Sequence, residues 1–312
     1  MRILVTGIAG FIGSSIARAL LREGHAVRGV DNFSTGKREN LADLHAIELL
    51  EGDLNQPGVA DAAVRGMEIV FHEAAIPSVP RSVKEPYLSF EANESATLRL
   101  LLAARDAGVK RVVYAASSSA YGNSETLPKV ETMTPAPISP YAVAKLAGEY
   151  YMQCFSRTYG LETVSLRYFN VFGPFQDPAS QYSGVLAVFI NRMLSAEPIQ
   201  IFGDGEQSRD FTYIDNVVSA NLAVAFAPAT EVSGRMFNVA TGARVTLNKA
   251  FSLLAQITNY KLQPQYMPVR VGDVRHSLAD ISAASRAFSY KPLVNFEEGS
   301  KRTVAWYQSL KA

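Results

Sequence analysis

Short apolar runs alternate with helical patterns along the first 170 residues of the chain. Hydrophobic periodicity predicts helices over 11–24, 86–107 and 141–159. Because the runs between these helices look buried on both faces, they indicate a doubly wound parallel sheet of the α/β class. The predicted strands are RILV (2–5), AVRGVD (26–31), IELLEG (47–52), EIVFHEA (68–74), RVVYAAS (111–117) and TVSLRY (163–168).

The pattern becomes less regular after residue 170. Helices are predicted over 182–194, 216–226 and 247–257, with short strands between them. No repeat of fixed period and no low-complexity linker separates this half from the first. We therefore expect residues 1–170 to form one domain, to which later segments return, and residues 171–312 to form mainly a smaller α/β lobe packed on it.

Charge and composition exclude several classes of function. The formal net charge is +1 and no run of Lys or Arg occurs, so a nucleic-acid partner is not expected. The histidines, His25, His45, His72 and His276, lack the spacing of metal ligands, and the single cysteine, Cys154, is expected to be a buried structural thiol. No apolar run reaches the roughly 18 residues of a membrane span, and the N-terminus enters a strand at once. We expect a cytoplasmic protein without membrane contact.

The turn TGIAGFIG, between the first strand and the first helix, carries Gly7, Gly10 and Gly13. A tight turn, a close backbone approach and helix packing each favour a residue without a side chain, and free N–H groups at a helix N-terminus suit a pyrophosphate. Asp31 ends the second strand 18 residues after Gly13, where a carboxylate accepts ribose hydroxyls and repels a 2′-phosphate. The pattern favours NAD over NADP, although its G-x-x-G-x-x-G spacing departs from G-x-G-x-x-G.

The segment YAVAK places Tyr141 and Lys145 four residues apart in a predicted helix, and therefore on one helix face. A free tyrosine titrates near 10, so a tyrosine that acts as a base near neutrality needs its pKa lowered by about three, which is roughly 4 kcal/mol. The Lys145 ammonium and a positively charged nicotinamide ring together could lower the pKa in this way. Beside a dinucleotide-binding turn, the pair is interpreted as catalytic.

At these motifs the chain resembles the extended short-chain dehydrogenase/reductase family, and within its NAD-dependent epimerases and dehydratases the nucleotide-sugar 4-epimerases. The resemblance covers essentially the whole chain and implies a Rossmann-type fold, tightly bound NAD, an NAD-binding domain over 1–170 and a mainly UDP-sugar-binding lobe over 171–312. Further matching segments are DNFSTGK (31–37), GDL (52–54), HEAA (72–75), RYFNVFGP (167–174), GDGEQSRDF (203–211), RVGDVRHSLADIS (270–282) and VAWY (304–307).

The resemblance implies a set of cofactor-binding residues. Asp53 and Leu54 border the adenine, whereas Ala74, Ala75 and Lys145 border the nicotinamide half. Asn93 either serves the cofactor or only caps and packs. The full set is Gly7, Gly10, Phe11, Ile12, Gly13, Asp31, Asn32, Ser34, Thr35, Gly36, Asp53, Leu54, Ala74, Ala75, Asn93, Tyr141, Lys145 and Tyr168.

Three serines end the strand over 111–117 and indicate which reaction follows. Relatives that eliminate water from the sugar have S-T-D-E-x-Y-G here, whereas this chain has Ser118 and Ser119 at the Asp and Glu positions. Without those carboxylates no evident group removes a C5 proton, so oxidation and reduction at C4 remain. The resemblance implies that Ser117 relays the 4-hydroxyl proton to Tyr141, beside Lys145, the three forming the catalytic set.

The resemblance also implies how a UDP-sugar is bound. Arg209 and Arg270 match diphosphate-binding arginines, Asn170 matches a substrate amide, and Asp273 matches a carboxylate at the ribose or uracil. The remaining substrate-binding residues are Ser78, Ser117, Ser118, Ser119, Tyr141, Gly184, Val185, Phe189, Gln200, Phe202 and Ser277.

Ser277 stands where some epimerases carry a tyrosine that narrows the sugar pocket. Because a small side chain leaves room for a 2-acetamido group, we expect interconversion of UDP-GlcNAc and UDP-GalNAc, with UDP-Glc and UDP-Gal as further substrates. The alternatives are a UDP-glucuronate 4-epimerase, a UDP-sugar dehydratase or decarboxylase, and a non-catalytic NAD-binding regulator. The resemblance further implies a homodimer that pairs the helices near 86–107 and 145–159.

Overall fold

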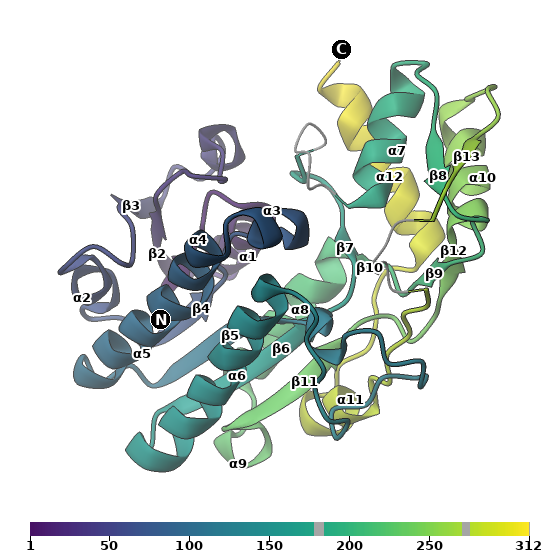
Figure 1. Ribbon diagram of the computed structural model, residues 1–312. Helices are drawn as coiled ribbons and strands as arrows, with labels where there is room; N and C mark the ends of the chain where they lie inside the picture. The colour runs from purple at the N-terminus through teal and green to yellow at the C-terminus, as the bar shows by residue number, and fades with distance from the viewer. Residues whose placement is uncertain (178–183, 270–274, 312) are drawn as a thin grey trace.

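The computed structural model describes residues 1–177, 184–269 and 275–311. Its centre is a seven-stranded parallel sheet with the strand order β11-β6-β5-β4-β1-β2-β3 (Figure 1). Six of the strands lie at the six predicted apolar runs, and the seventh, β11, comes from the second half of the chain. The α/β doubly wound class is confirmed. The strands are β1 (Arg2–Thr6), β2 (Ala26–Asp31), β3 (Ile47–Glu51), β4 (Ile69–His72), β5 (Arg111–Ser117), β6 (Glu162–Tyr168) and β11 (Arg235–Val239).

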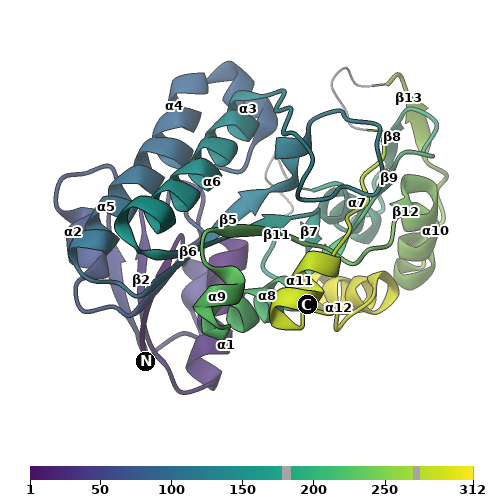
Figure 2. The same cartoon turned by 90° about the horizontal axis from the view of Figure 1, so that it is seen from below.

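Helices cover both faces of this sheet, as the view from below shows most clearly (Figure 2). On β1, Ile3 and Val5 belong to the apolar core on the α1 and α8 face, whereas Leu4 belongs to the core on the α2, α5 and α6 face. This alternation explains why the central strands are apolar throughout. One face carries α2 (Val59–Val64), α3 (Val79–Lys84), α4 (Pro86–Phe90), a π-helical segment (Glu91–Ser95), α5 (Ala96–Asp106) and α6 (Pro140–Tyr159); the other carries α1 (Phe11–Arg22) and α8 (Ile214–Phe226).

Two sequence expectations need correction on the α6 side of the sheet. The helix predicted over 86–107 is divided into α4, the π-helical segment and α5, and the preceding helix α3 was not predicted. Cys154 is exposed on α6 and does not lie in the core. Its neighbours Met152 and Phe155 take the buried positions, because α6 faces the sheet with only part of its circumference.

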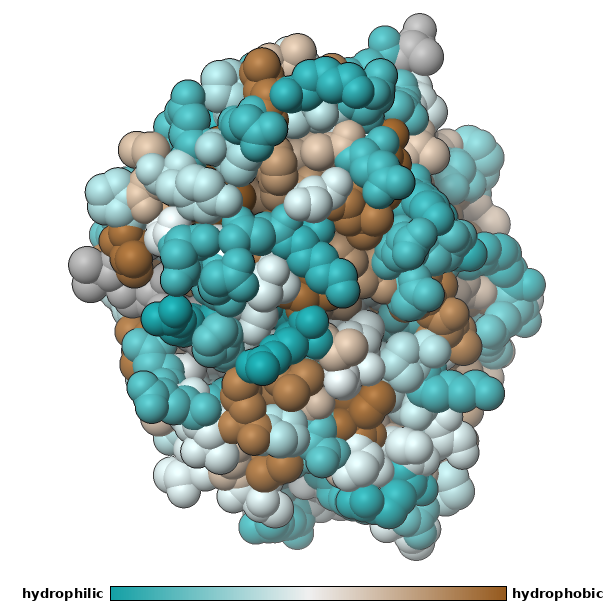
Figure 3. Space-filling view, turned by 90° about the vertical axis from the view of Figure 1, so that its right-hand side faces the viewer, coloured by the Kyte–Doolittle hydropathy of each residue, from teal (hydrophilic) through white to brown (hydrophobic). Residues whose placement is uncertain are grey.

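The second lobe stands beside the carboxyl ends of the strands (Figure 1). Its elements are α7 (Val185–Leu194), α10 (Leu247–Thr258) and α12 (Phe296–Ser309), with the strand pairs β7 (Val171–Phe172) with β10 (Thr212–Tyr213), β9 (Ser208–Arg209) with β12 (Val245–Thr246), and β8 (Gln200–Phe202) with β13 (Gln265–Met267). Its outer face is mostly hydrophilic, with hydrophobic residues in small groups between polar ones (Figure 3). Short helices α9 (Ala229–Val232) and α11 (Ser282–Phe288) flank β11, and 3₁₀ turns form over Arg38–Leu41 and Ser118–Tyr121.

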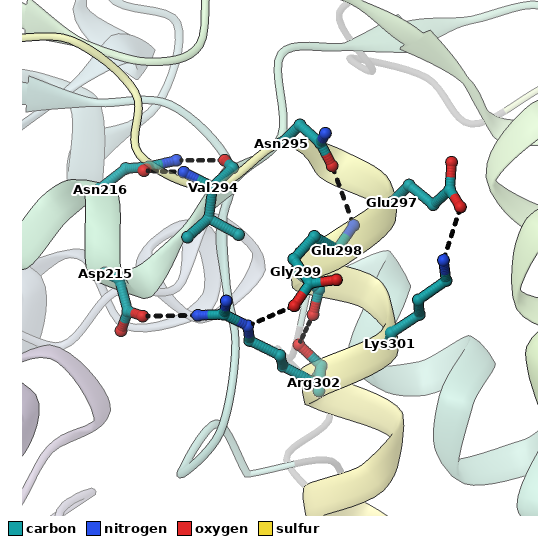
Figure 4. Close-up of polar contacts among 10 residues, drawn as sticks. Asp215, Asn216, Val294, Asn295, Glu297, Glu298, Gly299, Lys301 and Arg302 are labelled. Carbon is teal, nitrogen blue, oxygen red and sulfur yellow. Dashed lines mark hydrogen bonds and ion pairs between the residues drawn. The ribbon is translucent and has the colours of Figure 1, made fainter.

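Polar contacts join the second lobe to the helix layer behind the sheet (Figure 4). Asn216 on α8 donates to the Val294 carbonyl at 2.8 Å and accepts from the Val294 N–H at 2.9 Å. Asn295 then caps α12 by accepting from the Glu298 N–H at 2.9 Å. Arg302 on α12 pairs with Glu298 and with Asp215 of α8. The end of the chain is therefore attached to the first domain through α8.

No helix in the described part of the chain is long and apolar enough to cross a bilayer. Among the same residues, no group of three or more His, Cys, Asp or Glu side chains is arranged to hold a metal ion.

Candidate active site

A cavity of about 1530 Å³ follows the carboxyl ends of the central strands. The strand order reverses between β1 and β4, which is the place where doubly wound sheets bind ligands. On one side the cavity is lined by the turn after β1 and by the ends of β2, β4, β5 and β6; Asn170, Gly184, Arg209, His276 and Ser277 line the other side. The cavity therefore brings together residues that lie far apart in the sequence.

The glycine turn after β1 fits a dinucleotide pyrophosphate. Gly7 has a φ of +65°, and a Cβ on it would lie 2.7 Å from the Ala74 backbone. A Cβ on Gly13 would lie 2.3 Å from the Gly7 carbonyl oxygen, so neither position accepts a side chain. Gly10 caps α1 without a side-chain hydrogen bond, which leaves the N–H groups of the first turn for an anion. Phe11 and Ile12 of the same turn also line the cavity.

The ends of β2 and β3 bring together the residues that were predicted to bind the adenosine. Asp31 is buried, and its two carboxylate oxygens accept from the Ala9 and Phe33 N–H groups at 2.9 and 2.8 Å. Burial raises the pKa of Asp31, and these backbone hydrogen bonds oppose the rise. The cofactor residues predicted for this side all line the cavity, and they are Asp31, Asn32, Ser34, Thr35, Gly36, Asp53 and Leu54.

The predicted catalytic residues meet at the ends of β5 and α6. Ser139 caps α6 by accepting from the Ala142 N–H at 3.2 Å, and Pro140 occupies the first turn. Tyr141 and Lys145 follow one turn apart, and Ser117, at the end of β5, hydrogen-bonds to Tyr141. The end of β5 and the N-terminal part of α6 therefore bring the three residues together, with Tyr141 and Lys145 spaced as the YAVAK segment predicted.

Lys145 is buried with an incomplete set of polar partners. Its Nζ has no hydrogen-bond partner among the described residues and lies 4.4 Å from the centre of the Tyr114 ring. Burial lowers the pKa of Lys145 to about 8, although the carboxylates of Glu73 and Glu149 oppose this fall. A buried ammonium without an acceptor fits a site where ligand hydroxyls complete its hydrogen bonds.

The chain by itself does not lower the pKa of Tyr141. Burial raises the pKa of its phenol, and only the hydrogen bond with Ser117 acts in the opposite direction. A base at this position therefore needs the additional positive charge that the sequence interpretation assigned to the nicotinamide ring.

Ser119, the last of the three consecutive serines, has a role that the sequence did not predict. Ser119 donates its N–H and its hydroxyl to Ser117 Oγ, at 3.2 and 2.9 Å. Because Ser117 Oγ accepts both of these bonds, its own proton is free to point toward Tyr141. Ser118 lines the cavity beside them. Ser119 thus orients the proposed proton relay.

The second lobe lines the side of the cavity that was predicted to bind the sugar. Asn170 has a φ of +36°, and its Nδ2 donates to the Asp210 carbonyl at 3.1 Å and to Ser277 Oγ at 3.4 Å. Arg209 donates to the Ser208 and Arg275 carbonyls and lines the same cavity. The predicted residues Ser78, Ala74, Ala75, Tyr168 and Gly184 also line it.

Several predicted residues do not reach the cavity. Asn93 is buried behind its wall, where it accepts from the Ile76 N–H at 3.0 Å and donates to the Ser89 carbonyl at 2.9 Å. These contacts are of the kind that the packing role predicts, and the cofactor role stays a prediction. Phe189 lies in the apolar core. Val185, Gln200 and Phe202 are likewise absent from the cavity lining, and Arg270 and Asp273 lie outside the described residues.

Among the charged residues that line the cavity but were not predicted from the sequence are Glu73 and Lys129. Glu73 follows β4, and the charge directly after the apolar run IVFH was an available signal. Lys129 is almost fully buried and donates to the Ser124 carbonyl. Its strand-like bridge to Ala279 joins it to the segment that carries Ser277, a contact that no local pattern predicts.

Comparison with known proteins agrees with this geometry. The model of the NAD dependent epimerase/dehydratase family matches residues 3–240. A UDP-glucose 4-epimerase of Mycolicibacterium smegmatis is 37% identical over 99% of both chains. The structure of a UDP-glucose 4-epimerase from Thermotoga maritima with UDP-glucose is 41% identical, with a TM-score of 0.95 over 100% of both chains.

A UDP-N-acetylglucosamine 4-epimerase of Methanobrevibacter ruminantium is 38% identical, with a TM-score of 0.93 over 99% of this chain and 98% of that one. The family model covers well over half of the sequence, and these relatives match it from end to end. The chain belongs to the NAD-dependent epimerase/dehydratase family.

Proposed function

We propose that this protein is a UDP-sugar 4-epimerase that interconverts UDP-GlcNAc and UDP-GalNAc and also accepts UDP-Glc and UDP-Gal. The observation that carries the proposal is the meeting of Ser117, Tyr141 and Lys145 in one cavity whose β5 end carries serines at 118 and 119. The carboxyl groups on the cavity wall come from other elements, at positions such as Asp31 and Glu73. Elimination and decarboxylation therefore lack an acid or base at the β5 end.

The proposed roles follow from the contacts. Tyr141 takes the proton of the sugar 4-hydroxyl through Ser117, which Ser119 holds in position. Lys145, whose buried Nζ has no hydrogen-bond partner in the described chain, is proposed to hold a ribose hydroxyl of the cofactor. Bound NAD supplies reversible hydride transfer at C4 of the sugar. With NAD bound there, the hydride would return to the other face of the sugar after the sugar turned about its diphosphate, and Tyr141 would give back the proton it had taken, so the net redox change would be zero.

The nucleotide must stay bound while the sugar turns. A diphosphate carries about two negative charges, which guanidinium groups bind by paired hydrogen bonds. Arg209 lines the cavity at the second lobe and is proposed for this role, with Asn170 as a substrate amide. Arg270 and Asp273 remain proposals from sequence alone.

The direct test is incubation of the protein with UDP-GlcNAc, UDP-Glc and UDP-GlcA in separate reactions, with the products resolved by chromatography. We expect the 4-epimer of UDP-GlcNAc as the main product. Release of water or carbon dioxide would reject an epimerase, and turnover of UDP-GlcA alone would reject the proposed substrates.

Replacement of Ser277 by tyrosine tests the proposed basis of substrate choice. Ser277 lies on the cavity wall within hydrogen-bond distance of Asn170, so a phenol there would fill space beside the sugar. We expect kcat/KM for UDP-GlcNAc to fall at least tenfold relative to that for UDP-Glc, a difference of about 1.4 kcal/mol. The measurement compares both substrates on Ser277→Tyr and on Ser277→Ala. Equal losses on the two substrates in the tyrosine variant would refute the size filter.

UDP-glucuronate is the second candidate substrate, because the basic residue Lys129 lines the cavity and its backbone pairs with Ala279, two residues from Ser277. An ammonium there would suit a sugar carboxylate. Selective loss of UDP-GlcA turnover in Lys129→Met would favour this candidate, whereas loss of UDP-GlcNAc turnover alone would exclude it.

We further propose that the protein is a homodimer that pairs α3, α4 and α6. These helices pack together and expose large hydrophobic residues, namely Val83, Tyr87, Phe90, Val143 and Tyr150. Tyr87 is 70% and Tyr150 53% exposed, which is unusual for aromatic side chains on one surface.

The double variant Tyr87→Arg/Tyr150→Arg is therefore expected to be a monomer by light scattering after gel filtration, because burying two unpaired guanidiniums is unfavourable. Leu262→Arg, at an exposed site of the second lobe, is the matched control and should remain a dimer. A monomeric wild-type protein, or a dimer that survives the double change, would contradict this interface.

A further inference from the structure

One carboxyl group on the cavity wall has no part in the proton transfers proposed above. Glu73 follows β4 directly and precedes Ala74, whose backbone lies against Gly7. Its Oε1 accepts from the Tyr168 hydroxyl at 2.9 Å. Glu73 is partly buried beside this turn. An ionised carboxylate in such a place costs free energy unless a positive charge or hydrogen-bond donors stabilise it.

The hydrogen bond from Tyr168 is fixed by a third residue. Asn221 on α8 is fully buried, and its Nδ2 donates to the Tyr168 oxygen at 2.8 Å and to the Val217 carbonyl at 2.9 Å. The Tyr168 hydroxyl has two acceptors within reach, Glu73 Oε1 at 2.9 Å and Asn221 Oδ1 at 3.1 Å, and the shorter contact is the one to Glu73. Residues of β6 and α8 thus hold the carboxyl that follows β4 in one orientation.

The other oxygen of Glu73 is available to the contents of the cavity. Within residues 1–177, 184–269 and 275–311, Oε2 has no hydrogen-bond partner, and Glu73 lines the cavity together with Lys145 and Tyr168. In the sheet, β4 lies on the opposite side of β1 from β2, which carries Asp31. When Asp31 holds the adenosine and the glycine turn the pyrophosphate, Glu73 stands on the nicotinamide side.

Four titratable groups near Glu73 bear on its charge, and they are Lys145, His72, Tyr168 and Glu149. Lys145 on α6 is the cation that acts on it, but the Lys145 Nζ forms no hydrogen bond with Glu73 or with any other residue in the described chain. His72 bonds to Thr6 and Thr97 and is neutral, because burial lowers its pKa to about 3. Tyr168 is neutral because burial raises its pKa well above the usual value, and Glu149 is paired with Arg167.

Burial raises the pKa of Glu73 to about 7, while the Tyr168 hydrogen bond and the Lys145 charge oppose the rise. Near neutral pH this carboxyl is therefore divided between its protonated and ionised forms. A change of one charge in the cavity is enough to move that balance.

We propose that Glu73 is a charge-compensating residue of the cofactor site, whose carboxylate makes the site prefer oxidised over reduced NAD. The two forms of the nicotinamide ring differ by one positive charge and little in shape, so a nearby carboxylate discriminates between them through Coulomb attraction. Such a preference suits an enzyme that must begin each cycle with oxidised cofactor. The inference concerns the cofactor and holds for any sugar substrate.

The proposal has a defined pH dependence. The oxidised ring lowers the pKa of Glu73 and keeps it ionised, whereas with the neutral reduced ring the carboxyl takes up a proton as the pH falls. The preference for oxidised NAD should therefore rise with pH through the neutral range and level off above it.

The test equilibrates the holoenzyme with known mixtures of NAD and NADH, removes free nucleotide by gel filtration and measures the bound ratio by chromatography. For the wild type we expect the preference for NAD to increase roughly tenfold between about pH 6 and about pH 8. In Glu73→Gln the preference should fall roughly tenfold at the higher pH and become independent of pH. This readout does not depend on epimerisation, so it can succeed or fail separately from the proposed function.

Two further variants complete the experiment. Glu297→Gln removes one carboxylate from the exposed ion pair with Lys301 on α12 and should keep the wild-type ratio (Figure 4). Tyr168→Phe removes the hydrogen bond that stabilises the carboxylate and should move the transition to higher pH. If Glu73→Gln keeps the wild-type ratio at both pH values, the proposal is overturned. If Glu73→Gln does not fold, an unshifted transition in Tyr168→Phe overturns it.

Discussion

Replacement of Tyr141 by phenylalanine is expected to lower turnover of the UDP-sugar by about 10²- to 10⁴-fold, the usual contribution of a general acid–base group. Only the hydroxyl is removed, and α6 with its Ser139 cap and Pro140 start is unchanged. Ser117 then has no acceptor for the proton of the sugar 4-hydroxyl. Burial of the ring is retained, so a loss of stability should not mimic the effect.

The measurement is kcat with saturating UDP-sugar, together with the binding of UDP by calorimetry. UDP affinity should stay within about twofold, because Tyr141 faces the β5 end of the cavity and Arg209 the second lobe. Tyr150→Phe, about two and a half turns farther along α6 at an exposed position, is the matched control and should turn over substrate normally. Undiminished turnover in Tyr141→Phe would remove the basis of the catalytic assignment.

Replacement of Arg167 by methionine is expected to destabilise the protein by about 3–5 kcal/mol, because it leaves a buried carboxylate without its partner. Arg167 donates to both oxygens of Glu149, at 2.9 and 2.7 Å, and both side chains are at most 1% exposed. Domains of this kind are stable by only about 5–15 kcal/mol, so the loss should be evident as a lower midpoint in urea.

The pH dependence of this loss follows from Glu149. Burial raises the pKa of Glu149, and in the native protein the hydrogen bond and the charge of Arg167 lower it. Without Arg167 the folded-state pKa lies above the unfolded value, so folding favours the protonated form. The destabilisation should therefore be smallest below the unfolded-state pKa of about 4.3 and grow as the pH rises through the folded-state pKa.

Two controls separate the buried charge from simple loss of contacts. The double variant Arg167→Met/Glu149→Leu removes both charges and should recover most of the stability. Arg302→Met breaks an ion pair with Glu298 that is about half exposed, and it should cost no more than about 1 kcal/mol. If the double variant is as unstable as Arg167→Met, unpaired charge is not the cause.

The positions of the strands in the first half were predictable, because strands buried on both faces form continuous apolar runs such as RILV at β1. The order of the strands in the sheet was harder to predict from the sequence. β11 pairs with β6 although about 70 residues separate them, and only packing of β11 against α11 and β6 brings it to the sheet. The sequence also did not reveal that a π-helical segment interrupts the helix predicted over 86–107, because the helical pattern continues on both sides of that segment.

The residues expected to bind ligands show the same contrast between what the sequence predicts and what only the structure reveals. The position of Gly7, Gly13 and Asp31 on one cavity was predictable, because all three belong to one strand–helix–strand unit. Phe189 was expected to line the substrate pocket and lies instead in the core of the second lobe. A buried aromatic on an apolar helix and an aromatic on a pocket wall have the same sequence pattern, so only the packing distinguishes them.

By itself, the sequence determined the chemistry that is available to this protein. The i, i+4 spacing of Tyr141 and Lys145, and the serines in place of carboxylates after β5, are local features, and local features survive folding unchanged. Only the tertiary structure decided the electrostatics. The pKa values of Lys145 and Glu73 lie near 8 and 7 because α6, β4, β6 and α8 bury these groups together, and burial depends on residues distant in the sequence.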